Sequence, residues 1–205
     1  MSTIIYPSPI FGPVHSRRLG ISLGINLMPA DGKMCNFDCI YCECGFNKDH
    51  VPTLRRPSRE AVATALEAKL REMRTRNERP DVLTFAGNGE PTAHPDFQNI
   101  IDDTVRLRNQ YCPEAKISVL SNSTFIFKDS VFDALMRVDN NILKVDTVDS
   151  DYINEVDRPQ QPSYDIHKII DQLCRFNGHV IIQSMFLKGR AEDGTDVDNT
   201  HERFV

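Results

Sequence analysis

Apolar and polar positions change their spacing repeatedly along this chain, and each spacing predicts a different kind of element. Residues 21–28 alternate apolar with small or polar residues and end before Pro29, which is typical of a strand with one buried face. In residues 58–77 the apolar positions recur every three or four residues, which predicts a helix. Further strands are predicted at the short apolar runs 82–86, 117–120, 142–145 and 180–186.

Helical patterns separate these strands. One helix is predicted to begin near Phe97, a second covers residues 129–138, and a third runs from Ile166 to Phe176. Gly178, just after the third helix, is a usual C-terminal cap. Strands that alternate with helices imply right-handed βαβ units and a parallel sheet. No internal repeat or long linker divides the chain, so the sequence predicts one α/β domain over residues 1–205. The polar stretch 193–205 lies where another helix is expected to begin.

The composition is that of an ordinary globular domain, with 205 residues, of which 40% are hydrophobic and 26% charged. The net charge of -5 gives no overall field that would attract a phosphate backbone, so charge does not support tRNA as a partner. The basic pairs Arg17-Arg18 and Arg55-Arg56 remain local contact points for nucleic acid. No segment reaches the ~18 apolar residues of a membrane span, and the N-terminus lacks signal-peptide features. We therefore expect a cytoplasmic protein without a membrane partner.

Four of the six cysteines lie within ten residues, at Cys35, Cys39, Cys42 and Cys44. Such crowding argues against distributed disulfides and favours metal or cluster ligation in a reducing compartment. The spacing of Cys35, Cys39 and Cys42 places three thiolates in one loop, where they can ligate three irons of a cubane and leave the fourth without a protein ligand. An open iron can bind and activate a substrate, whereas a fully ligated cluster only transfers electrons.

Residues 34–42, with an aromatic residue just before the third cysteine, resemble the cluster loop of the radical S-adenosylmethionine (SAM) superfamily. In that family the loop follows the first barrel strand, which is where the strand pattern places it. The stretch 12–20, continuing into 24–27, more narrowly resembles the iron-sulfur oxidoreductase branch related to wyosine-base tRNA-modifying enzymes. The resemblance implies a partial parallel (β/α) barrel with five of the usual six strands, truncated or incomplete at its C-terminal end.

The resemblance also implies an activity. A [4Fe-4S] cluster on Cys35, Cys39 and Cys42 would give one electron to bound SAM, break the bond from sulfur to C5′ and generate a 5′-deoxyadenosyl radical that abstracts hydrogen from a substrate. A reducing partner such as flavodoxin or ferredoxin is expected. The substrate class stays open between tRNA, a peptide and a small molecule, and the sequence assigns no catalytic side chain.

Candidate SAM contacts lie at the ends of the predicted strands. The run Gly87-Asn88-Gly89-Glu90-Pro91 resembles the family's Gly-Gly-Glu-Pro motif, with Asn88 inserted, and offers backbone carbonyls and a carboxylate to the methionine amine. Tyr41 is assigned to packing against the cluster and the adenine. The remaining candidates for the ribose or the methionine carboxylate are Ser121, Asn122, Lys144, Asp146 and Arg158.

Two other ligating interpretations of the cysteines stay open, and a third, free buried thiols, is disfavoured by four cysteines within ten residues. Cys44 could complete a four-thiolate zinc knuckle in a non-enzymatic module that binds metal or nucleic acid, or a fourth ligand could make the loop a ferredoxin-like electron carrier. Zinc sites usually combine two separate Cys-x2-Cys pairs, and ferredoxins use a different spacing. We therefore favour the SAM-cleaving enzyme and interpret Cys44 as a bystander.

Overall fold

A computed structural model describes residues 3–190, 194 and 196–199, in which one six-stranded sheet has the order β1-β2-β3-β4-β5-β6. Five neighbouring strands run parallel: β2 (Gly20–Ile25), β3 (Val82–Phe85), β4 (Lys116–Ser121), β5 (Asn140–Lys144) and β6 (Ile181–Gln183). The α/β fold with five parallel strands is therefore confirmed. The first strand, β1 (Ile10–Ser16), pairs antiparallel with β2.

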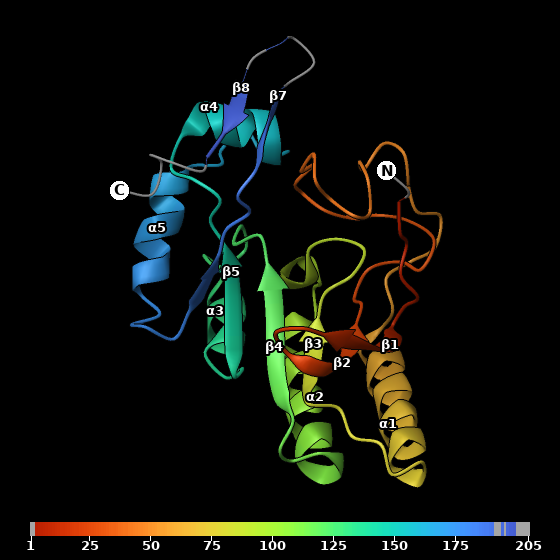
Figure 1. Ribbon diagram of the computed structural model, residues 1–205. Helices are drawn as coiled ribbons and strands as arrows, with labels where there is room; N and C mark the ends of the chain where they lie inside the picture. The colour runs from red at the N-terminus through yellow and green to blue at the C-terminus, as the bar shows by residue number, and fades with distance from the viewer. Residues whose placement is uncertain (1–2, 191–193, 195, 200–205) are drawn as a thin grey trace.

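A helix follows each parallel strand before the next one begins, as the pattern predicted. These helices are α1 (Arg59–Thr75), α2 (Phe97–Tyr111), α3 (Asp129–Leu135) and α5 (Ile166–Cys174). The side chain of Ser58 accepts from the Ala61 N–H and so caps α1, whose apolar stripe is buried. Figure 1 shows α1, α2 and α3 side by side along the sheet. No helix in the described part of the chain has both the length and the apolar character needed to cross a membrane.

Three features differ from the predictions. The β1 strand was missed because it is an exposed edge strand interrupted by Pro13, which hides any alternation. Where a helix was expected near residue 193, β7 (Lys188–Arg190) and β8 (Asp196–Asp198) form an antiparallel pair, and residues 200–205 lie outside the described chain. The segment predicted as a polar loop contains a short helix, α4 (Ser150–Tyr152), and a π-helical turn, η2 (Ile153–Asp157).

The parallel arrangement determines where the site lies. Strands β2, β3, β4 and β5 all end at the same edge of the sheet, where the cysteine loop and the turn after β3 also lie (Figure 1). The main core fills the space between the sheet and the helices and includes Leu23, Ile25, Leu83 and Phe85. Because side chains alternate along a strand, the intervening residues of β2 and β3 face the opposite side of the sheet. That side is free of helices α1 to α3.

Phe85, the last residue of β3, offers a test of the core packing. It is fully buried, and its ring meets the Phe97 ring edge-on with centroids 6.1 Å apart. Phe85→Ala should lower the free energy of unfolding by about 3–5 kcal/mol in urea titrations, because the site cannot collapse around the missing ring. The matched control is Phe127→Ala, whose side chain is 49% exposed and whose loss should stay below ~1 kcal/mol. Equal losses in the two variants would contradict this assignment of the core.

Candidate active site

Backbone hydrogen bonds attach the cysteine loop to the turn after β3. The Met34 N–H donates to the Asn88 carbonyl at 2.8 Å, and the Glu90 N–H donates to the Met34 carbonyl at 3.3 Å. Gly89 lies between them with φ of +143°, and a Cβ there would stand 1.9 Å from the Met34 carbonyl oxygen. Only glycine fits this contact. The cysteine triplet and the 87–91 turn, two separate motifs in the sequence, are one structural unit.

The three candidate ligands lie on this loop and are each partly exposed. The sulfur of Cys35 lies 3.4 Å from the Phe37 N–H nitrogen and 3.7 Å from the Asn122 amide nitrogen. Among the described residues, no three His, Cys, Asp or Glu side chains converge on a point that could hold one metal ion. Ligation of a cubane does not require such convergence, because each thiolate binds a different iron. Three partly exposed thiols on one short loop are a donor set that fits an iron-sulfur cluster.

The thiols differ in how readily they ionise. Burial raises the pKa of Cys35 to about 11 and that of Cys39 to about 12. Hydrogen bonding with Cys44 lowers the pKa of Cys42 to about 6, against the effect of burial and with help from the Lys33 ammonium. Since ligands must be thiolates, Cys42 is the one closest to its ligating form at neutral pH. Cys35 and Cys39 would need a nearby positive charge to ionise at neutral pH.

The buried side chain of Lys33 connects two parts of the cysteine loop. Its side chain is 1% exposed, and its ammonium lies 3.2 Å from the Asp38 carboxylate and donates to the Gly45 carbonyl at 2.7 Å. Burial alone would lower the pKa of Lys33, but the charges of Cys42, Cys35 and Asp38 raise it. A buried cation beside the thiols therefore offsets part of the negative charge that ligation requires.

Glu90 joins the turn to the end of β4. Its buried carboxylate accepts from the backbone and hydroxyl of Thr92, at the short helix η1 (Pro91–Ala93), and from the Asn122 N–H at 2.6 Å. Burial raises the pKa of Glu90. The Asn122 amide in turn donates to Asn36 on the cysteine loop at 2.7 Å, and the Ser121 hydroxyl accepts from the Ser123 N–H at 3.1 Å. Glu90, Ser121 and Asn122, which were predicted as SAM contacts, therefore make hydrogen bonds within the protein.

The side chain of Asn88 has a structural role as well. It is fully buried, accepts from the Tyr6 N–H at 2.7 Å, and donates to the carbonyls of Tyr6 and Pro29 at 2.8 Å each. The residue inserted among the glycines therefore anchors the N-terminal segment. Sequence reasoning assigned no such contact, because residues 6 and 88 are far apart in the chain.

Lys144, Asp146 and Asp157 form a buried charged group at the end of β5. The Lys144 ammonium lies 3.1 Å from Asp146 and 2.5 Å from Asp157, and the Tyr41 hydroxyl donates to both carboxylates. Burial and these neighbouring charges raise the pKa of Tyr41, so it stays a donor. Asp157 was not recognised from the sequence, although it lies directly before Arg158. The charged group ties the cysteine loop to β5 and η2.

Arg158 lies apart from that group. Its backbone adopts the left-handed conformation, with φ of 49°, and its guanidinium donates to the Glu155 carbonyl at 3.0 Å and lies 5.6 Å from the Phe46 ring centroid. Its side chain is 41% exposed. Its carbonyl accepts from the Asp38 N–H at 3.2 Å, so the backbone of Arg158 supports the cysteine loop while its side chain engages Glu155.

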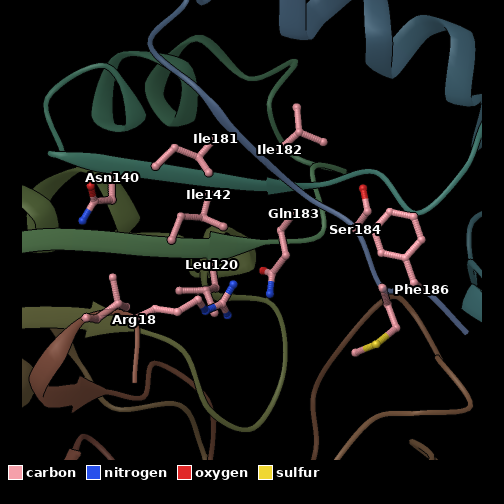
Figure 2. A pocket seen from close by; sticks show the side chains of 11 residues that line it. Arg18, Leu120, Asn140, Ile142, Ile181, Ile182, Gln183, Ser184 and Phe186 are labelled. Carbon is pink, nitrogen blue, oxygen red and sulfur yellow. The ribbon is translucent and has the colours of Figure 1, made fainter. Parts of the chain in front are cut away.

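A cavity of about 560 Å³ borders the cysteine loop on the helix-free side of the sheet. Tyr41, Cys42 and Gly87 line one end of it. The strands line it with the small residues Ser22, Gly24 and Thr84 and with the larger Phe11, Val14 and Leu120. A neighbouring cavity of about 570 Å³ continues along β4, β5 and β6 (Figure 2). The thiol of Cys42 and the turn after β3 therefore open onto a space large enough for a bound small molecule.

The Radical SAM superfamily model matches residues 31–199. The chain belongs to this superfamily. The resemblance drawn from the cysteine loop is thus confirmed, and with it the assignment as an enzyme of unspecified reaction. Members of the superfamily use SAM together with an iron-sulfur cluster.

Curated relatives include UPF0026 proteins from two organisms. The Helicobacter pylori (strain 26695) protein is 34% identical over 187 residues, which cover 89% of this chain and 58% of that protein. The Methanocaldococcus jannaschii protein is 34% identical over 186 residues, which cover 86% of this chain and 53% of that protein. The radical SAM chain therefore spans little more than half the length of these relatives.

Solved structures share the fold at low sequence identity. SuiB from Streptococcus suis, in a crystal structure with S-adenosylmethionine, aligns with a TM-score of 0.56 and 18% identity over 83% of this chain and 35% of that one. A radical SAM methyltransferase from Sphaerobacter thermophilus aligns with a TM-score of 0.58 and 14% identity over 84% of this chain and 50% of that one. These alignments show that the radical SAM chain has the fold of larger superfamily proteins.

Gly89→Ala tests the contact between the two motifs. The added methyl group would overlap the Met34 carbonyl, so the cysteine loop should separate from the turn and iron content after anaerobic reconstitution should fall at least about tenfold. Gly189→Ala is the control, because no atom lies within 4 Å of the position that its Cβ would take and its φ is outside the left-handed region. Full iron loading in Gly89→Ala would show that the contact does not position the thiols.

Lys144→Met tests the buried charged group. Removing the cation leaves the Asp146 and Asp157 carboxylates buried together, so the free energy of unfolding should drop by about 3–5 kcal/mol in urea titrations. Adding Asp157→Asn should recover part of this loss, because one of the two negative charges is removed. The control is Lys188→Met in the exposed pair with Asp198, where a change below ~1 kcal/mol is expected. A double variant no more stable than Lys144→Met would contradict the proposed pairing.

Proposed function

We propose that this chain is a single radical SAM domain that holds a [4Fe-4S] cluster on Cys35, Cys39 and Cys42 and cleaves SAM reductively. The main support is the hydrogen-bonded contact between the cysteine loop and the 87–91 turn, beside a cavity that Cys42 and Gly87 both border. The thiolates of Cys35, Cys39 and Cys42 would hold the cluster, which would supply the one electron needed to cleave SAM at its sulfur–C5′ bond into methionine and a 5′-deoxyadenosyl radical.

The protein's own contribution is to position SAM and exclude water. Gly87 and Tyr41 border the cavity and are the candidates for direct contact with SAM. The Glu90 carboxylate accepts from the Asn122 N–H and the Ser121 hydroxyl accepts from the Ser123 N–H, so we assign these three predicted residues to holding the turn in place. Lys144 and Asp146 fix the Tyr41 hydroxyl in the same way. Arg158 remains a candidate only if its guanidinium leaves Glu155.

Reductive cleavage of SAM requires a one-electron donor to the cluster, and the resulting radical requires a substrate from which it takes hydrogen. A flavodoxin or ferredoxin suits the first role, and the thiol-rich loop favours the reducing environment of the cytoplasm. The substrate classes are tRNA, a peptide and a small molecule. The likeness of residues 12–27 to enzymes of wyosine-base modification supports tRNA, whereas the net charge of -5 does not.

Anaerobic reconstitution with iron and sulfide tests the proposed function. The wild-type protein should turn brown, bind about four irons and release 5′-deoxyadenosine from SAM under dithionite. Alanine at Cys35, Cys39 or Cys42 should reduce that release to background, because the cluster loses a ligand. Cys174→Ala is the control for thiol removal, since Cys174 is exposed and lies at the end of α5.

Cys44→Ala separates the enzyme from a zinc-binding module. The Cys44 thiol lies 3.5 Å from the Gly87 carbonyl oxygen and is buried. If it is a bystander, the variant keeps its iron and its SAM cleavage. A colourless wild-type protein with one zinc, lost in Cys44→Ala, would contradict the enzyme and establish the four-thiolate knuckle.

A further inference from the structure

The two cavities on the helix-free side of the sheet share walls and form one elongated cavity that is open to solvent, since Arg18 and Met185 in the shared wall are exposed. Both are lined by Arg18, Leu19, Leu120 and Met185. One end lies against Cys42 and Gly87, and the other reaches Gln183 at the end of β6. If SAM binds at the cysteine end, a second molecule has room beyond it, next to Arg18.

Arg18 borders this space from the exposed turn between β1 and β2. The Ser16 hydroxyl accepts from the N–H groups of Arg18 and Leu19, at 3.3 and 3.2 Å, which fixes the hairpin between β1 and β2. The Ile21 N–H donates to Asp81 at 2.7 Å and attaches the same hairpin to the start of β3. Figure 2 shows the Arg18 side chain extended beside Leu120, with its guanidinium inside the cavity. The fixed turn therefore presents the charge in a defined place.

The guanidinium has no acidic partner there. Among the described residues, Arg18 is the one lysine or arginine that lines either cavity, and its guanidinium makes no hydrogen bond or ion pair with any of them. Glu43 is the one carboxylate that lines either cavity, and it accepts from the Tyr6 hydroxyl at 2.8 Å. Figure 2 shows the Gln183 amide pointing toward the guanidinium from β6. Together they offer several N–H donors to one point in the cavity.

The other walls of that region are mostly apolar, with Asn140 and Ser184 as further polar side chains. Leu19, Leu120, Ile142 and Met185 surround the space between the guanidinium and the strands. A planar guanidinium binds carboxylate or phosphate through two parallel hydrogen bonds. A guanidinium without an acidic partner, beside mostly apolar walls, suits a ligand with one anionic group on an apolar body.

We propose that this cavity binds an organic substrate that carries a carboxylate or phosphate, with its anionic group on Arg18 and Gln183 and its apolar part toward Cys42. This orientation rests on the proposed function, because it places a C–H bond of the substrate on the SAM side of the cavity. The binding site itself is independent of the radical chemistry and is tested by binding.

Calorimetric titration of the reconstituted, SAM-loaded protein with benzoate, phenyl phosphate and neutral benzamide tests the site. At least one anionic probe should bind about tenfold more tightly than benzamide, and the tighter of the two identifies the anionic group. Arg18→Gln should remove that tenfold advantage, equivalent to about 1.4 kcal/mol. Gln183→Glu should weaken the anions as much, because the new carboxylate would pair with the guanidinium. The control is Arg17→Gln, since Arg17 lies on the same turn but lines neither cavity.

Three results would contradict the proposed site. Benzamide could bind as tightly as the anions, or Arg17→Gln and Arg18→Gln could lose equal affinity for the anions. The third is a loss of SAM affinity in Arg18→Gln as large as its loss of affinity for the probes. The last would place Arg18 in the SAM site. Release of 5′-deoxyadenosine by the same wild-type preparation tests the proposed function separately. Its failure, with anion selectivity intact, would refute SAM cleavage and leave the anion site standing.

Discussion

The arrangement of the site depends on one close approach, the contact of the Met34 carbonyl with Gly89. Parallel neighbours β2 and β3 end at the same edge of the sheet, so the loops that leave them meet there without any special linker. The meeting becomes a defined contact only because residue 89 has no side chain and its φ of +143° is accessible to glycine. The backbone bonds on either side then hold the first cysteine in a fixed relation to the turn.

Two buried lysines strengthen that arrangement from opposite sides. Lys33 pairs with Asp38 inside the loop, and Lys144 pairs with Asp146 and Asp157 beneath Tyr41. A buried charge is tolerated only when it is paired, so each lysine fixes the segments that carry its partners. The cysteine loop is therefore held by ion pairs before any cofactor binds. Such preorganisation reduces the ordering that cluster and SAM binding must impose.

The sequence predicted the parallel strands and their helices because their apolar periods are regular and each element buries a continuous face. It could not predict β1, whose pairing depends on the neighbouring β2 and whose own pattern is exposed. The two site motifs were recognisable from local spacing. The contacts of Asn88 with Tyr6 and of Asp157 with Lys144 were not, because each joins distant segments. The alternation within a strand showed which face is buried but not what the other face would enclose.

The face of the sheet opposite the helices borders the cavity, whereas the thiols lie on a loop beyond the strand ends. In β2 the residues that alternate with buried Leu23 and Ile25 are Ser22 and Gly24, and Phe11 packs into the space that a Cβ on Gly24 would fill. Small side chains on this face create the cavity, while the loops beyond the strand ends carry the thiols. Strand substitutions can therefore change the volume and polarity of the cavity without moving the cysteines. On the proposed function, radical formation depends on the cysteine loop and substrate choice depends on the cavity walls, so different residues determine the two properties.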